Sequence, residues 1–106
     1  MGKSSKCSRG EKETKSIMQT EKECYVTHKP YGLHKHHIFG GPNRKISEQN
    51  GFYIWLIPEF HNMSDKGIHF NKAFDLEMKM ECQRRFEEEH SREEFMNLIG
   101  RNYLEN

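Results

Sequence analysis

The chain has few cysteines and no long apolar run. Its three cysteines, Cys7, Cys24 and Cys82, are widely spaced and include no C-x-x-C pair, which excludes a disulfide framework and a four-cysteine zinc site. No apolar segment approaches the roughly 20 residues that cross a bilayer, and none resembles a signal peptide. We therefore expect a soluble, reduced, cytoplasmic protein with no membrane partner.

Apolar residues in general are scarce. They make up 33% of the 106 residues, so we expect a single domain with a small core. The first 16 residues, MGKSSKCSRGEKETKS, have almost no apolar side chains whose burial could offset the entropy of ordering them. The sequence predicts a flexible basic segment over residues 1–16 and one folded domain over residues 17–106.

Charge is distributed unevenly along the chain. The net charge is +1, but residues 1–35 carry eight Lys/Arg against four Glu, whereas residues 73–106 carry five Lys/Arg against nine acidic residues. A basic front half and an acidic tail suit a domain that presents one face to a polyanion, although a solvated Lys/Ser-rich terminus is the plainer account of the first residues.

The pattern of apolar residues predicts an α+β fold. Short strands are expected at residues 23–27, 33–39 and 52–57, and the polar segment 43–51 reads as a long loop that joins the last two into a hairpin. Apolar residues at spacings of three and four between Phe70 and Phe86 predict a helix that packs on this hairpin. The Ser91–Glu94 segment, SREE, is a capping-box pattern that predicts a second, C-terminal helix burying Phe95, Leu98 and Ile99.

Six of the seven histidines fall between residues 28 and 69, and imidazole is among the commonest metal ligands. Adjacent strand residues point to opposite faces, so of His36 and His37 one can bind an ion while the other acts beside it. Most single histidines are simply hydrogen-bonded side chains, and we favour that reading for His28, His34 and His90.

The stretch from His36 to Asn71 contains HHIFGG and, further on, NMSDKGIHFN. With the intervening strand, this pattern resembles the HNH endonucleases, or ββα-metal nucleases, and in particular small phage and prophage HNH-like proteins. The resemblance covers roughly residues 24–85. It implies a ββα-metal core of hairpin plus helix, and a metal-dependent endonuclease that hydrolyses phosphodiester bonds of DNA with one divalent metal ion.

Carried over to this chain, the resemblance makes His36 a metal ligand, His37 the general base and His61 a second ligand. The third ligand is His69 or Asp65, and His69 is favoured because Gly67 is expected to end any helical turn that follows His61. An all-histidine site favours binding of Zn or Ni, whereas a carboxylate ligand shifts the preference toward Mg or Mn.

The HNH motif has an asparagine in its middle, which usually orients the general base. In this chain it should lie near Phe52, but no asparagine stands there. Asn50 is the nearest candidate for this catalytic role. Separately, Arg44, Lys45 and Lys66 are candidate contacts to DNA phosphates. If Asn50 cannot reach His37, either some other carbonyl holds the base, or the chain is a DNA-binding accessory protein with a degenerate site that cuts poorly. A third hypothesis is a protein that binds other proteins and whose metal ion only stabilises the fold.

Overall fold

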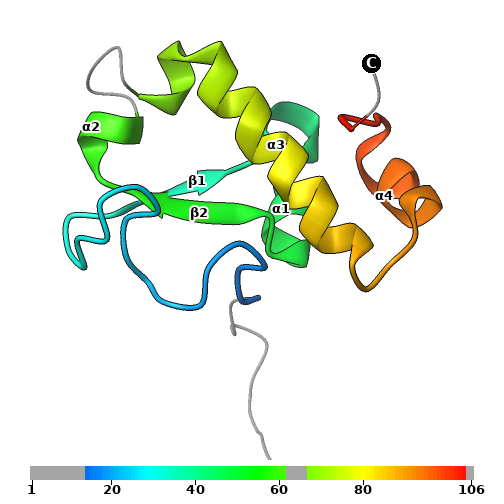
Figure 1. The fold of residues 1–106 in the computed structure, drawn as a ribbon, viewed down its shortest axis with the longest axis horizontal. Coiled ribbons are helices and arrows are strands. Elements are labelled where there is room, and N and C mark those ends of the chain that lie inside the picture. Colours follow the sequence, from blue (N-terminus) through cyan, green and yellow to red (C-terminus); the bar gives the residue numbers. More distant parts are fainter. Residues whose placement is uncertain (1–13, 62–66, 105–106) are drawn as a thin grey trace, which may run out of the picture.

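The computed structural model describes residues 14–61 and 67–104, and it confirms the α+β class (Figure 1). The elements in chain order are β1 (His34–His37), the 3-10 turn η2 (Gly41–Asn43), α1 (Arg44–Asn50), β2 (Tyr53–Leu56), α2 (Pro58–His61), the 3-10 turn η3 (Ile68–Phe70), α3 (Lys72–Glu87) and α4 (Arg92–Ile99). None of the helices in these two ranges is both long and apolar enough to cross a membrane.

The two strands form an antiparallel hairpin, within the residues where strands were predicted. His36 pairs with Ile54 and His37 with Tyr53, so the two histidines point to opposite faces of the sheet. The sheet face that carries His36 and Ile54 packs against the hydrophobic core, which includes Met78 and Phe86 of α3. In Figure 1, α3 lies across the hairpin while α1 and α2 lie near its two ends.

The outer face of the hairpin is partly covered by the N-terminal segment. Ser16 Oγ donates to the carbonyl oxygen of Tyr53 at 2.6 Å, and Tyr53 Oη donates to the carbonyl oxygen of Thr14 at 2.5 Å. Residues 14–16 of the predicted flexible segment are therefore hydrogen-bonded to the sheet. The rest of that predicted segment, residues 1–13, lies outside the described residues.

The predicted long loop between the strands is wrong, because seven of its residues form α1. Ser47 Oγ, fully buried, donates to the carbonyl oxygen of Phe39 at 2.8 Å and accepts from Phe39 N at 3.1 Å. Gly51 ends the helix at φ 76°, and a Cβ there would lie 2.2 Å from the Lys15 carbonyl oxygen. These long-range contacts hold a segment, RKISEQN, that has no apolar stripe of its own.

The predicted strand at residues 23–27 is also wrong. Cys24 N donates to the carbonyl oxygen of Lys29, and His28 N donates to that of Cys24, so the segment is a turn. A single backbone hydrogen bond, from Tyr25 N to the Trp55 carbonyl oxygen, ties it to β2. The strand propensity of this segment is overridden because the chain reverses on itself here.

The two predicted helices are present, with one correction. Phe70 is 64% exposed and lies in η3, so the apolar stripe of α3 begins later than predicted. Asn71 Oδ1 caps the helix by accepting a hydrogen bond from Phe74 N at 3.0 Å. The predicted capping box of α4 is confirmed, with Ser91 and Glu94 bonded reciprocally. Phe95 and Ile99 are buried as expected, whereas Leu98 is half-buried.

Candidate functional site

Three histidines from three different elements meet at one end of the hairpin. His36 lies on β1, His61 ends α2 and His69 lies in η3, and one ring nitrogen of each lies within 4.8 Å of the others. The shortest contact joins Nε2 of His61 to Nε2 of His69 at 3.0 Å. Nitrogens bound to one tetrahedral zinc ion at about 2.0–2.1 Å are roughly 3.3 Å apart. This pair is therefore already close to ligand spacing.

His36 has the environment of a metal ligand rather than of a core histidine. It is buried, and its Nε2 has no hydrogen-bond partner among the described residues. Burial, followed by the imidazoles of His69 and His61, lowers the pKa of His36 to about 3, and burial lowers the pKa of His61 to about 4. Both rings are thus neutral at pH 7, with lone pairs available for a cation.

His34 contacts the other side of His61. The two Nδ1 atoms lie 3.1 Å apart and the rings meet edge-on. A neutral imidazole that binds an ion through Nε2 carries its proton on Nδ1, and His61 would then donate that proton to His34. This contact agrees with the prediction that His34 is a hydrogen-bonded side chain, although the sequence analysis did not name His61 as its partner. The signal was its position two residues before His36, on the same face of the strand.

The cluster opens to solvent on one side, since His36 is buried, His61 half-buried and His69 exposed. The three predicted ligands are thus brought together, and their all-nitrogen donor set suits Zn or Ni. Asp65, the competing third ligand, lies outside the described residues. Three histidine ligands would leave a fourth coordination position on a tetrahedral zinc ion, which water or another ligand could take.

His37, on the opposite face of β1, is hydrogen-bonded to Glu48 of α1. Its Nε2 lies 2.7 Å from Glu48 Oε1, and Lys35 Nζ lies 3.2 and 3.3 Å from the two oxygens of the same carboxylate. The hydrogen bond to His37, followed by the interactions with Lys35, lowers the pKa of Glu48. An ionised carboxylate only accepts, so the proton of a neutral His37 lies on Nε2 and the lone pair on Nδ1.

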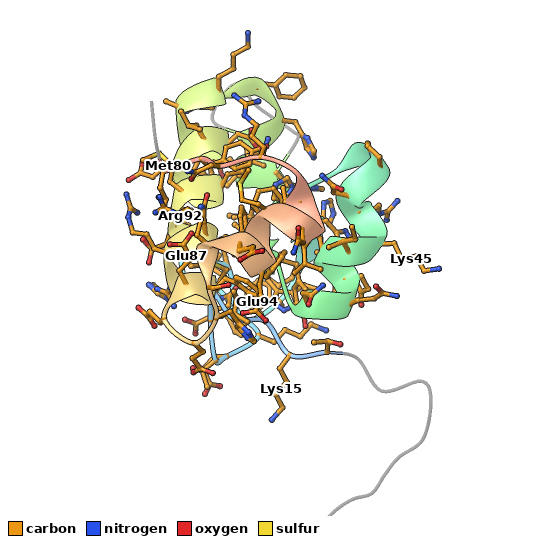
Figure 2. The ribbon with its side chains drawn as sticks, turned by 90° about the vertical axis from the view of Figure 1, so that its right-hand side faces the viewer. Lys15, Lys45, Met80, Glu87, Arg92 and Glu94 are labelled. Atoms are coloured by element: carbon orange, nitrogen blue, oxygen red, sulfur yellow. The ribbon has the colours of Figure 1, made fainter. Side chains whose placement is uncertain are left out.

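The predicted phosphate contacts Arg44 and Lys45 lie beside this histidine. Both are exposed on the first turn of α1, and with His37 and Glu48 they line a shallow cavity of ≈ 450 Å³. Figure 2 shows Lys45 pointing from α1 into solvent, away from Glu87 on α3. Lys66, the third predicted contact, lies outside the described residues.

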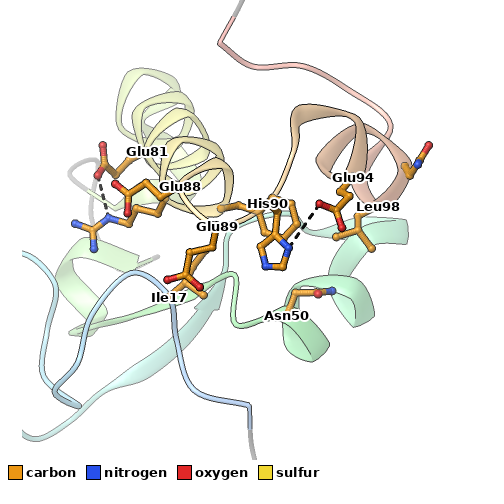
Figure 3. A pocket seen from close by; sticks show the side chains of 11 residues that line it. Ile17, Asn50, Glu81, Glu88, Glu89, His90, Glu94 and Leu98 are labelled. Carbon is orange, nitrogen blue, oxygen red and sulfur yellow. Dashed lines mark hydrogen bonds and ion pairs between the residues drawn. The ribbon is translucent and has the colours of Figure 1, made fainter.

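Asn50 is not brought to His37. Its side-chain amide donates to the Ile46 carbonyl oxygen at 2.9 Å, and it lines a different and larger cavity of ≈ 850 Å³ beside His90 (Figure 3). Sequence reasoning therefore named the wrong partner for His37 and missed Glu48. Had residues 44–50 been recognised as a helix, positions 44, 45 and 48 would have stood out as one face.

The larger cavity is chemically unsuited to a polyanion. Four glutamates line it against one arginine, Arg85. Figure 3 shows Glu88 and Glu89 on one side of His90 and Glu94 on the other. Glutamates of the acidic C-terminal part of the sequence are thus gathered on this side of the domain.

Cys24 and His28 form a C-x3-H spacing that could hold a structural zinc ion, but in the structure their side chains have different partners. The buried Cys24 Sγ accepts a hydrogen bond from Thr27 N at 3.4 Å, while the exposed His28 ring lies 2.5 Å from Glu23 Oε2.

Comparison of the chain with protein-family models, with curated proteins and with solved structures found no match.

Proposed function

We propose that this chain is a metal-dependent DNA endonuclease with an HNH-type site on a ββα-metal core. The observation that carries the proposal is the division of β1 between its two faces. His36 lies with His61 and His69 in a three-nitrogen cluster, and the next residue, His37, points the other way toward a carboxylate. The residue types, their order in the chain and the resemblance to HNH nucleases support the same conclusion.

In this proposal the side chains of β1 have separate roles. His36, His61 and His69 hold a divalent ion, which when bound supplies Lewis-acid stabilisation of the negative charge on the phosphate and the leaving oxygen. His37 accepts a proton at Nδ1 from a water molecule. The oxygen of that water bonds to phosphorus as the bond to O3′ breaks, O3′ takes a proton from solvent, and the products are a 3′-hydroxyl and a 5′-phosphate.

Arg44 and Lys45 bind the DNA backbone next to His37. Their exposed charges contact phosphate oxygens without reading bases, so binding is tolerant of sequence and sensitive to salt. The acidic cavity lined by Glu81, Glu88 and Glu94 repels the same backbone, which favours approach of DNA from the side of α1.

The test is cleavage of supercoiled plasmid with Zn, Ni, Mg or Mn, and with EDTA. We expect metal-dependent cleavage, lowered about 10²-fold or more by His37→Ala without loss of metal, whereas His36→Ala loses the metal. His90→Gln, far from the site in the acidic cavity, is the matched control and should cleave normally. DNA binding without cleavage under every metal would instead support the accessory protein with a degenerate site.

A further inference from the structure

The carboxylate beside His37 has a role that the HNH resemblance does not supply. We propose that Glu48 is the positioning residue of the general base, and that its carboxylate holds the proton of His37 on Nε2 so that Nδ1 is the basic nitrogen. This inference rests on the proposed function. It gives Glu48 the task for which Asn50 was the sequence candidate.

The fold fixes the place of this carboxylate. Glu48 follows Ser47, whose buried hydroxyl bonds both backbone groups of Phe39, two residues after His37. The C-terminus of α1 is held in turn at Gly51, whose carbonyl oxygen accepts from Ile17 N at 2.9 Å. Because α1 is anchored at both points, its backbone holds Glu48 within reach of His37, and the two side chains meet at 2.7 Å.

The histidine is equally constrained. Only 13% of the His37 side chain is exposed, and its ring meets that of Tyr53 edge-on at 6.4 Å. A ring that is packed on one side and hydrogen-bonded through Nε2 has one orientation and one tautomer. Both are required of a base that accepts a proton at a particular atom.

Lys35 completes the arrangement. It lies two residues before His37 on the same face of β1, within 3.3 Å of both carboxylate oxygens of Glu48, and above the Tyr53 ring at 4.3 Å. A lone carboxylate next to the reacting phosphate would repel it. Paired with Lys35, the carboxylate orients the imidazole while the group as a whole carries no net negative charge.

A purely structural role, in which Glu48 ties α1 to the sheet, makes different predictions. In Glu48→Gln the side chain keeps its size and can still bridge the two elements, but its amide nitrogen can donate to His37 Nε2. That contact would move the imidazole proton to Nδ1 and remove the basic lone pair. Where a carboxylate sets the tautomer of a catalytic histidine, the amide substitution costs up to about 10⁴-fold in kcat.

The experiment compares Glu48→Gln, Glu48→Ala and the neighbouring control Gln49→Ala, which is exposed on α1. We expect unchanged metal content and melting temperature in all three, and kcat for plasmid cleavage lowered about 10²-fold or more in Glu48→Gln, at least as far as in Glu48→Ala, with KM little changed. In a His37→Ala background, Glu48→Gln should cause no further loss.

A second readout does not depend on activity. The ¹⁵N shifts of the His37 ring should report the Nε2–H tautomer in the wild type, and the Nδ1–H tautomer in Glu48→Gln. Near-normal kcat in Glu48→Gln with a defect only in Glu48→Ala would overturn the positioning role in favour of a structural tether, as would an unchanged tautomer in both variants. Absence of cleavage by the wild type defeats the proposed function instead, and the tautomer then tests the Glu48–His37 contact alone.

Discussion

The exposed ligand His69 offers the sharpest test of the metal site. Because its side chain is exposed, His69→Ala removes a ligand nitrogen without opening a cavity in the core. We expect this variant to lose bound zinc, with metal per chain measured by mass spectrometry falling from one to near zero. The buried His36 could not be tested so cleanly, since its replacement also changes core packing.

The loss of zinc should also be visible as a loss of stability. An ion that binds only the folded chain at a free concentration about 1,000 times its Kd adds about 4 kcal/mol to the free energy of unfolding. For a domain of this size, each kcal/mol shifts the melting temperature by about 4–8 °C. EDTA should therefore lower the melting temperature of the wild type by about 15–30 °C, and should leave His69→Ala unchanged because that variant has no ion to lose.

The matched comparison is Asp65→Ala, which removes the competing ligand. If His69 is the third ligand, Asp65→Ala keeps its metal and its sensitivity to EDTA. The reasoning from the histidine cluster is refuted if His69→Ala keeps full metal occupancy while Asp65→Ala empties the site, since a carboxylate would then complete the set and Mg or Mn would be the expected ions.

Three further outcomes follow from the site. In EDTA, the free energy of unfolding should fall as pH drops from about 6.5 toward 4: the pKa values of His36 and His61, about 3 and 4, lie below those of the unfolded chain, which therefore binds more protons. Urea titrations should show a slope approaching about 1.4 kcal/mol per pH unit for His36 alone, and a flat profile contradicts the buried, neutral assignment. His34→Ala should weaken zinc binding about 10–100-fold in a chelator competition, and equal affinity would remove His34 as the partner of His61. Neutralising Arg44 and Lys45 together should reduce the slope of log K for DNA against log salt by at most about two; an unchanged slope would exclude α1 from the binding face.

Much of the local structure follows from the sequence alone. The continuous run of apolar, strand-favouring residues at 52–57 predicts β2, and strand alternation by itself separates His36 from His37. The capping box of α4 is equally local, because Ser91 and Glu94 are three residues apart and bond each other. These features need no distant partner, so the order of residues is sufficient to predict them.

The tertiary structure decided the rest. Helix α1 is held by contacts with Phe39 and Lys15, which lie in other parts of the chain. No apolar periodicity within RKISEQN predicts a helix. Once that segment is a helix, Glu48 lies against His37 and Asn50 faces the opposite cavity, which inverts the sequence-based assignment. The approach of His61 and His69 to His36 likewise depends on how α2 and η3 pack against the hairpin, and packing of distant segments is what a local pattern cannot encode.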